Sequence, residues 1–201
     1  IKAMDMIDTL EINIETVEKS RISDVDFNDI KFGRICSDHM FIADYIDGSW
    51  NDFRIAPFGN LKISPANLAL HYGQSVFEGL KAYKSEQGDV LIFRPYDNAQ
   101  RLNISAQRMC MPSFPEDIFM QALSTLLELD KQWIPSNPDC ALYIRPFMFA
   151  ADEYIGIKPS DTYKFLVITS PVGPYYPEPI EVYVETKYTQ SVQGGVGFAK
   201  A

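Results

Sequence analysis

Two consecutive helical stretches, with strand-like runs before and after them, constrain the fold of this chain more than any other feature of its sequence. Asp97 offers an N-cap for a first helix over 98–109, whose apolar residues share one face: Leu102, Ala106 and Met109. A second helix begins near Pro115 and extends to Trp133, with apolar residues at helical spacing: Ile118, Ala122, Leu126 and Leu129. Apolar stripes of this kind are typical of helices packed against a core.

Strand-like runs lie on both sides of the helices. Upstream, Met40–Tyr45 closes at the turn signal Asp47-Gly48, and residues 74–84 and 90–93 form a hairpin. Downstream, three further strands are expected, at residues 141–150, 163–170 and 180–185. A hairpin, two helices and then strands is the order of an α+β domain rather than of βαβ repetition. We expect an antiparallel sheet with two helices packed on one face.

A proline-rich segment, Pro171–Pro179, divides the chain and resembles an interdomain linker. We therefore expect a small α+β domain over residues 1–174, in which residues 1–32 form a loosely packed arm. Residues 175–201 are expected to be the linker and the opening strand of a second, barrel-like α/β domain.

The charge balance and the sparse ligand residues exclude several classes of function. The formal net charge of −9 repels nucleic acid and anionic membranes, and the lysines and arginines form no basic patch. No apolar run is long enough to span a bilayer. Three cysteines without CxxC spacing are typical of reduced thiols in a cytoplasmic protein. Two distant histidines, His39 and His71, argue against a zinc site, so we expect no bound metal.

Lys200 follows the glycine-rich segment Gly194–Gly197, where the backbone can pass close to a ligand or another chain segment. Its amine could form a Schiff base, clamp a phosphate or remain an ordinary surface charge. The phosphate-loop motif fails, because Ala199 precedes the lysine and Ala201 follows it where Ser or Thr is needed. The residues themselves leave the other two interpretations open.

Two further cationic groups lie where they could bind anions. Arg101 follows the start of the first helix, where a guanidinium suits a phosphate, although it could also lie over the helix surface. Tyr143 and Arg145 share one face of a strand and could hold a carboxylate, or form an interface salt bridge. Tyr72 and Phe77 could wall a pocket or belong to the core.

Taken in order, these pieces resemble the branched-chain amino-acid aminotransferases, which are fold type IV pyridoxal-phosphate enzymes. No single piece is specific, but their joint order and spacing are. The resemblance runs from about Phe32 to the end of the chain and rests on seven segments: Ser37–Met40, Ala69–Gly73, Val76–Lys81, Gln100–Leu102, Leu142–Pro146, Ser170–Gly173 and Gly194–Lys200.

The resemblance implies a role for each polar group. Lys200 would form the Schiff base with pyridoxal 5'-phosphate and move the α-proton of the substrate. Arg101 would grip the cofactor phosphate, Tyr143 would bind the substrate carboxylate, and Arg145 would read the side-chain carboxylate of glutamate. Cys36 stands where relatives often carry an aromatic residue, so substrate-side packing differs there.

The resemblance also implies walls for the substrate pocket. Tyr72, Phe77 and Tyr175 would supply aromatic rings, with Tyr72 contributed across the interface of a homodimer. Ile155-Gly156-Ile157 would be a loop that closes the apolar side-chain pocket. Further cofactor-binding groups of the family lie beyond the lysine, so we expect this chain alone to bind cofactor poorly and not to turn over.

The implied function is reversible transfer of an amino group between Leu, Ile or Val and 2-oxoglutarate, with glutamate as the other product. Two alternatives use the same fold: a D-amino-acid aminotransferase or an aminodeoxychorismate lyase, although those relatives generally lack the Tyr143–Pro146 strand in this form. A third is a non-catalytic module for binding or dimerisation.

Overall fold

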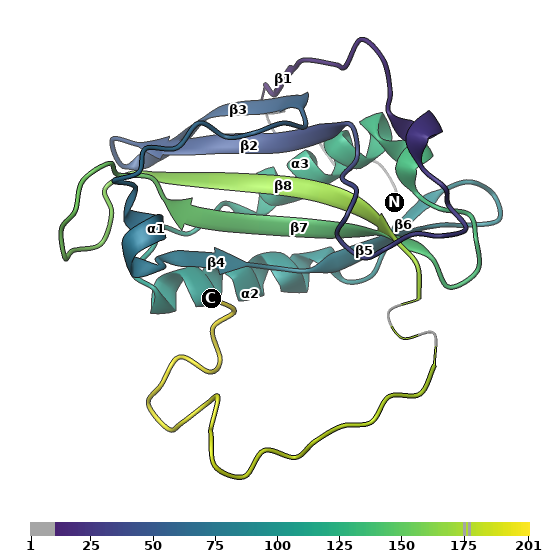
Figure 1. Cartoon of the computed structure of the whole chain (residues 1–201). Helices are drawn as coiled ribbons and strands as arrows, with labels where there is room; N and C mark the ends of the chain where they lie inside the picture. The colour runs from purple at the N-terminus through teal and green to yellow at the C-terminus, as the bar shows by residue number, and fades with distance from the viewer. Residues whose placement is uncertain (1–10, 175, 177) are drawn as a thin grey trace.

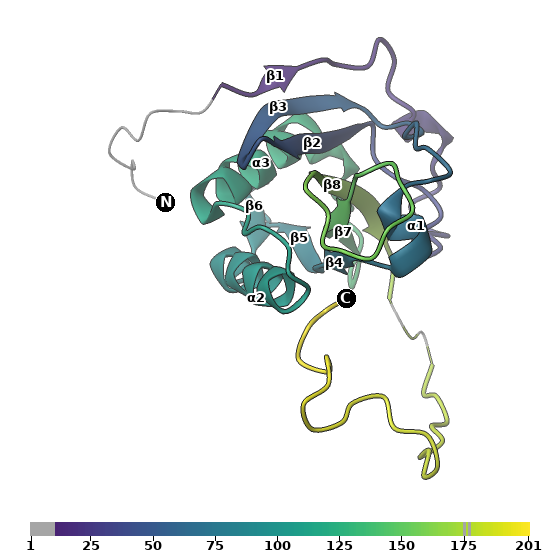
Figure 2. The ribbon, with the colours of Figure 1, turned by 90° about the vertical axis from the view of Figure 1, so that its left-hand side faces the viewer.

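In this computed structural model of the chain, residues 11–174, 176 and 178–201 are described. One eight-stranded sheet runs in the order β1-β3-β2-β8-β7-β5-β6, and β4 pairs with β7 outside that path. Figure 1 shows helices α2 and α3 behind the sheet, and Figure 2 shows the sheet curling toward them. The α+β fold expected from the sequence, with two helices packed on an antiparallel sheet, is confirmed.

Most of the expected strands form, but the strand over Ser49–Pro57 was not predicted. Among the described pairs, only β1 with β3 is parallel, and the rest are antiparallel. Asp47 and Gly48, both at positive φ, join β2 to β3 as the turn signal predicts. The strands are β1 (Asn13–Ile14), β2 (His39–Ile46), β3 (Ser49–Pro57), β4 (Ser75–Phe77), β5 (Leu80–Lys84), β6 (Val90–Ile92), β7 (Ala141–Ala150) and β8 (Tyr163–Val172).

Both long helices form, but the first begins earlier than expected. Asp97 is not its N-cap: α2 (Pro95–Arg108) starts at Pro95, whose fixed φ suits the first helical position, and Asp97 lies in the first turn, paired with Arg94. The remaining helices are α1 (Leu68–Tyr72), α3 (Glu116–Leu129) and the short 3-10 turns η1 (Ile22–Asp24) and η2 (Lys131–Trp133).

The core lies between the helices and the sheet. Side chains of α3 that are buried include Leu123 and Leu126, both inaccessible to solvent. They pack in one cluster with aromatic rings, of which Phe114 and Phe165 stack with centroids 3.9 Å apart. Each fully buried side chain of this size contributes about 1.5–3 kcal/mol to folding. This packing fixes α2 and α3 against the strands that carry the site.

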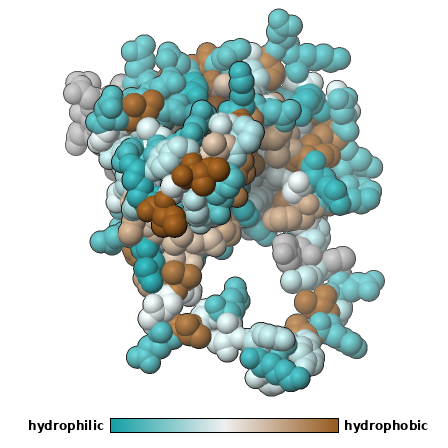
Figure 3. Space-filling model, turned by 60° about the vertical axis from the view of Figure 1, so that its left-hand side comes forward, coloured by the Kyte–Doolittle hydropathy of each residue, from teal (hydrophilic) through white to brown (hydrophobic). Residues whose placement is uncertain are grey.

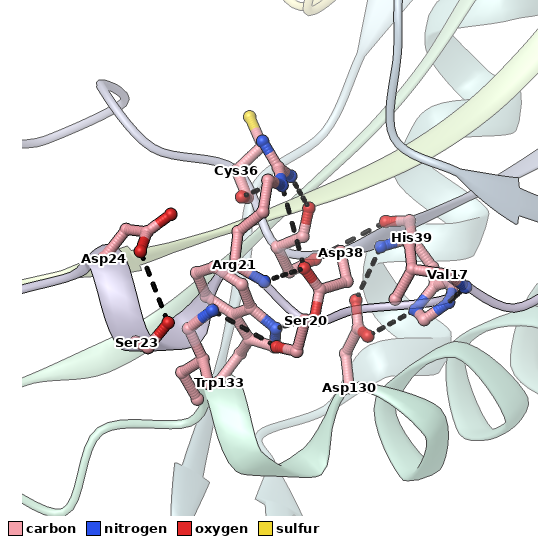
Figure 4. A network of polar contacts seen from close by, with 12 residues as sticks. Val17, Ser20, Arg21, Ser23, Asp24, Cys36, Asp38, His39, Asp130 and Trp133 are labelled. Carbon is pink, nitrogen blue, oxygen red and sulfur yellow. Dashed lines mark hydrogen bonds and ion pairs between the residues drawn. The ribbon is translucent and has the colours of Figure 1, made fainter.

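A buried polar network ties the N-terminal segment to the sheet (Figure 4). The Asp38 carboxylate accepts hydrogen bonds from the Trp133 indole at 2.9 Å and from the Arg21 amide at 3.0 Å. The Val17 amide donates to Nε2 of His39, so Nδ1 carries the proton and donates to Asp130 at 2.6 Å. Two buried acids therefore hold residues 17–21 beside the start of β2.

The chain after β8 forms no further strand in the described residues. Residues 180–185, expected to open a second domain, lie exposed and irregular, because no neighbouring strand offers them backbone partners. Pro171 belongs to β8 rather than to a linker, opposite Leu142. Figure 1 shows the chain after β8 looping away from the sheet and returning beside β4 and α2. No helix among the described residues has the length and apolar character that crossing a membrane requires.

Candidate functional site

The site forms around three consecutive residues between β4 and β5. Phe77 pairs with Phe147 and Leu80 with Ile144, so one register runs through the intervening Glu78 and Gly79. The Glu78 amide donates to the carbonyl of Pro146 at 2.8 Å, but Pro146 has no amide to return a bond. The ladder is interrupted here, and each of the three residues contacts a different predicted group.

Glu78 binds Arg101 through two parallel hydrogen bonds. Nε and Nη2 of Arg101 donate to the Glu78 carboxylate at 2.5 and 2.7 Å. The Glu78 side chain is fully buried, whereas the Arg101 side chain is 53% exposed. Charge-assisted hydrogen bonds of this paired geometry fix the orientation of the guanidinium and are stronger than neutral hydrogen bonds. The arginine is thus anchored at one edge, and the rest of its side chain reaches the surface.

The pair has a clear electrostatic consequence. Burial acts to raise the pKa of the Glu78 carboxyl, but hydrogen bonds from Arg101, Asn98 and the Gly79 amide outweigh it and lower that pKa. The same bonds to Glu78 raise the pKa of the Arg101 guanidinium. Both groups are therefore charged at neutral pH.

Tyr143 and Arg145 meet on one face of β7, as their spacing predicts. Nε and Nη2 of Arg145 donate to the Tyr143 hydroxyl at 3.1 and 2.7 Å. The guanidinium carbon lies 4.5 Å from the centroid of the Phe77 ring, within the range of a cation–π contact. Gly79 lies directly against Tyr143, because a Cβ at this position would be 2.6 Å from the hydroxyl oxygen.

Lys200 lies at the same place although it is far away in the sequence. Its carbonyl accepts from the Phe77 amide at 3.0 Å, and its amide donates to the Ser105 hydroxyl of α2 at 3.0 Å. The Nζ atom is 4.8 Å from the Phe77 centroid. The Phe77 ring is thus shared by the cations of Lys200 and Arg145.

The combined charge of this cluster suits anionic ligands. Three cationic side chains gather at Phe77–Gly79: Arg145 and Lys200 at the Phe77 ring, and Arg101 paired with the buried Glu78 carboxylate. A tyrosine hydroxyl lies beside them as a further polar group. Phosphates and carboxylates are the groups that such cations bind. Among the described residues, no group of three His, Cys, Asp or Glu side chains is arranged to hold a metal ion.

Apart from Phe77, the described residues predicted to form the pocket walls lie at a second location. Tyr72 is 46% exposed on α1, and Ile155 and Ile157 are 69% and 96% exposed on the loop before β8. A bridge between Asn67 and Glu153 holds this loop beside α1. Figure 3 shows hydrophobic side chains on the side of the molecule that carries these two segments. Tyr175 lies outside the described residues.

Gly156, the middle residue of that loop, lies under a ring. A Cβ at Gly156 would be 2.3 Å from the ring of Tyr154, so a larger residue here would displace that ring. In the described part of the chain no hydrogen bond, ion pair or ring contact joins residues 155–157 to Phe77 or Lys200. Their common pocket therefore stays a prediction.

Four residues of the site were not predicted from the sequence: Glu78, Gly79, Asn98 and Ser105. An acidic residue between Phe77 and Gly79, in a run of strand-forming residues, is the one signal that could have marked Glu78. Asn98, Arg101 and Ser105 follow helical spacing and lie toward the site, but an amide and a hydroxyl on a helix are too common to be singled out.

Comparison with solved structures gives the class of fold first. A T.th. branched-chain amino acid aminotransferase with pyridoxamine 5'-phosphate superposes with a TM-score of 0.51 at 25% identity, over 68% of this chain and 41% of that one. The described sheet and helices therefore have the fold of the N-terminal part of that enzyme. The chain matches no protein-family model.

Comparison with curated sequences gives the relatives. Branched-chain-amino-acid transaminase 1 of Bacillus subtilis (strain 168) is 46% identical over 87% of this chain, and aminotransferase 2 of that organism is 44% identical over 96%. The relative from Mycolicibacterium smegmatis is 39% identical over 84%. The chain spans about half the length of these relatives, 51%, 53% and 47% respectively. The resemblance is confirmed: this chain is homologous to branched-chain-amino-acid aminotransferases over their N-terminal part.

Proposed function

We propose that this chain forms part of an enzyme that transfers an amino group between branched-chain L-amino acids and 2-oxoglutarate with pyridoxal 5'-phosphate. The homologues named branched-chain-amino-acid aminotransferases, at 44–46% identity, support the reaction class. The observation that carries the proposal is the meeting of Lys200, Arg101 and the Tyr143–Arg145 pair around Phe77–Gly79.

The residues present fit this cofactor. A phosphate needs a fixed cation at the surface, which Arg101 provides, and an aldehyde needs an amine, which Lys200 provides. When bound, pyridoxal phosphate supplies an electron-withdrawing ring that weakens bonds at the substrate α-carbon. Lys200 would hold it through a Schiff base at Nζ, and the same amine would carry the α-proton.

The remaining cluster residues would bind and orient the substrate. The Tyr143 hydroxyl, held by Arg145, would bind the α-carboxylate, and the Arg145 guanidinium would read the second carboxylate of glutamate. The Phe77 ring offers an apolar surface for a branched side chain. A site of this kind would accept one alkyl and one charged substrate, because the Arg145 cation lies 4.5 Å from the centroid of the Phe77 ring and so places charged and apolar groups next to each other.

The outer pocket would be completed by an assembly. We propose that Tyr72, Tyr175 and the Ile155–Ile157 loop form apolar walls, and that a second copy of the chain contributes Tyr72 in a homodimer. The exposure of Tyr72 and of both isoleucines supports this, since large apolar side chains gather at interfaces. We place the enzyme in the cytoplasm, as its unpaired cysteines suggest.

The test is to locate the covalent bond. In the complete gene product loaded with pyridoxal phosphate, borohydride reduction followed by peptide mapping is expected to place a pyridoxyl group on Lys200. Lys200→Ala should remove the label, and Lys158→Ala, which removes an exposed lysine paired with Asp161, should keep it. Labelling at another lysine contradicts the proposal. Activity with L-leucine but not D-alanine is expected, and the reverse would favour a D-amino-acid aminotransferase.

A further inference from the structure

We propose that Glu78 is a positioning residue for Arg101: it holds the guanidinium in the orientation in which a phosphate binds. The inference rests on the proposed function and deepens it, because it concerns the same phosphate site. It is carried by the paired geometry of Glu78 and Arg101 and by the way Glu78 is itself held.

Glu78 uses one edge of the guanidinium and leaves the other available. Its carboxylate accepts Nε–H and one Nη2–H of Arg101. An arginine carries five N–H donors, so Nη1 and the outer Nη2 hydrogen remain for a ligand. In the described structure Nη1 has no partner, and the Arg101 side chain is 53% exposed. The free edge is therefore the one that reaches the surface.

The carboxylate cannot turn to follow the arginine. Its Oε2 also accepts from Asn98 Nδ2 at 2.9 Å and from the Gly79 amide at 3.1 Å. The Glu78 backbone is fixed to the Pro146 carbonyl at 2.8 Å. Asn98 and Arg101 are three residues apart on one helix face, so both sides of the carboxylate are set by α2. A flexible arginine side chain is thereby held in one conformation before any ligand arrives.

Two effects of Glu78 on a phosphate oppose each other. Its negative charge repels the ligand, whereas its hydrogen bonds remove the rotamer freedom that Arg101 would otherwise lose on binding. Because Arg101 is partly exposed, solvent near the ligand weakens the repulsion between the Glu78 carboxylate and the phosphate. We expect the positioning effect to exceed the repulsion.

The experiment compares two ligands that differ only in the phosphate and lack the aldehyde. Dissociation constants of pyridoxamine 5'-phosphate and pyridoxamine are measured in the complete gene product by fluorescence titration. Glu78→Gln is expected to weaken pyridoxamine 5'-phosphate about tenfold, because the amide cannot accept two parallel N–H bonds, and to leave pyridoxamine within about twofold. A purely structural role would weaken both ligands equally and overturn the inference, as would tighter phosphate binding.

A double variant tests whether Glu78 acts through Arg101. Arg101→Met should lose phosphate affinity, and adding Glu78→Gln should cause no further loss, because the positioned group is gone. Additive losses contradict the inference. The double variant also removes both charges of the buried pair and leaves neither unpaired, so it remains measurable if Glu78→Gln alone does not fold.

Two controls separate the possible failures. Asp44→Asn removes another partly buried acid, which pairs with Arg54 outside the site, and should leave the phosphate preference unchanged. If the unsubstituted enzyme binds both ligands equally, the proposed phosphate site itself is wrong. If it prefers the phosphate and Glu78→Gln keeps that preference, only the inference about Glu78 is wrong.

Discussion

At the scale of single residues, Phe77, Glu78 and Gly79 determine where the polar groups of the site lie. The Phe77 ring receives Arg145 and Lys200, the Glu78 carboxylate receives Arg101, and Gly79 makes room for the Tyr143 hydroxyl. Alternation along a strand would send neighbouring side chains to opposite faces. Three adjacent residues contribute here because both faces carry partners: α2 contacts Glu78 on one face, and side chains of β7 contact Phe77 and Gly79 on the other.

Gly79→Ala is expected to disturb substrate binding while the protein stays folded. The new methyl group would be 2.6 Å from the Tyr143 oxygen, so the tyrosine must move away from Arg145. In the complete enzyme we expect KM for the amino acid to rise about tenfold, a loss typical of one charge-assisted hydrogen bond. Gly59→Ala is the matched control, since its Cβ would meet only the Pro57 carbonyl at 3.9 Å. Equal KM values for both variants would contradict the proposed role of Tyr143.

Asp38→Asn should change how the free energy of unfolding depends on pH. Burial acts to raise the pKa of Asp38, but hydrogen bonds from the Arg21 amide, Ser20 and Trp133 outweigh it, so the folded-state pKa is lowered. Its stabilisation is therefore complete above the unfolded pKa, about 3.9, and is lost as pH falls through the folded value.

The measurement is urea unfolding at several pH values between about 7 and 2. The free energy of unfolding of the unsubstituted protein should fall below about pH 4, and that of Asp38→Asn should be lower at pH 7, by roughly 1–3 kcal/mol, and flatter in acid. Asp29→Asn, at an exposed position, controls for loss of a carboxylate. Parallel curves for Asp38→Asn and the unsubstituted protein would show that the carboxylate is not held as described.

At the scale of secondary structure, a proline in β7 and one face of α2 create the site together. Pro146 interrupts the pairing of β7 between its partners β4 and β5: the Glu78 amide bonds the Pro146 carbonyl, no amide returns a bond, and the Gly79 amide bonds the Glu78 carboxylate instead. The helix supplies Asn98, Arg101 and Ser105 on one face. The apolar residues of α2 and α3 hold that face in place, so the core indirectly determines the geometry of the site.

Leu126→Ala should destabilise the whole domain. The side chain is fully buried between α3 and the sheet, so its removal leaves a cavity that costs about 2–5 kcal/mol. Leu91→Ala, on the exposed edge strand β6, removes the same atoms from a side chain that is 52% exposed and should cost less than about 1 kcal/mol. Chemical denaturation monitored by circular dichroism would measure both. A loss for Leu91→Ala as large as that for Leu126→Ala would contradict the assigned core.

At the scale of the whole molecule, the sheet and helices form one packed unit, whereas the segment after β8 touches it chiefly near its far end. Residues 178–198 are almost entirely exposed, and Lys200 is held by the Phe77 amide and the Ser105 hydroxyl. Segments with few buried contacts open with little free-energy cost. The position of Lys200 in the described chain thus depends on two backbone hydrogen bonds and one ring contact.

Hydrogen exchange of the 201-residue chain should show this difference. Amides of β7 and β8, which pair along ten residues, are expected to exchange slowest. Amides of residues 180–193 should exchange at nearly the rate of an unfolded peptide, because no ladder protects them. Protection in 180–193 comparable to that of β7 would mean that this segment forms a structure different from the one described.

The regular parts of the fold could be predicted because their causes are local. The Asp47-Gly48 turn, the stripe of α3 and the strand 141–150 each depend on residues close together in the sequence. The start of the first helix was predicted wrongly because a second start signal lies nearby: Pro95 begins α2 two residues before Asp97. The strand predicted at 180–185 does not form in the described chain, because strand-forming residues need a neighbouring strand and none lies beside them.

The sequence by itself determined the class of fold, through its periodicities, and which cationic and aromatic residues deserved testing, through their resemblance to a known family. Only the tertiary structure decided that Lys200 lies beside Phe77 and that Arg101 is bound by a buried Glu78. The physical reason is that burial and pairing of a charge depend on groups from distant segments, and neither can be read from one residue or its neighbours. A carboxylate between two strands is ordinary until the fold removes it from water and pairs it with a cation.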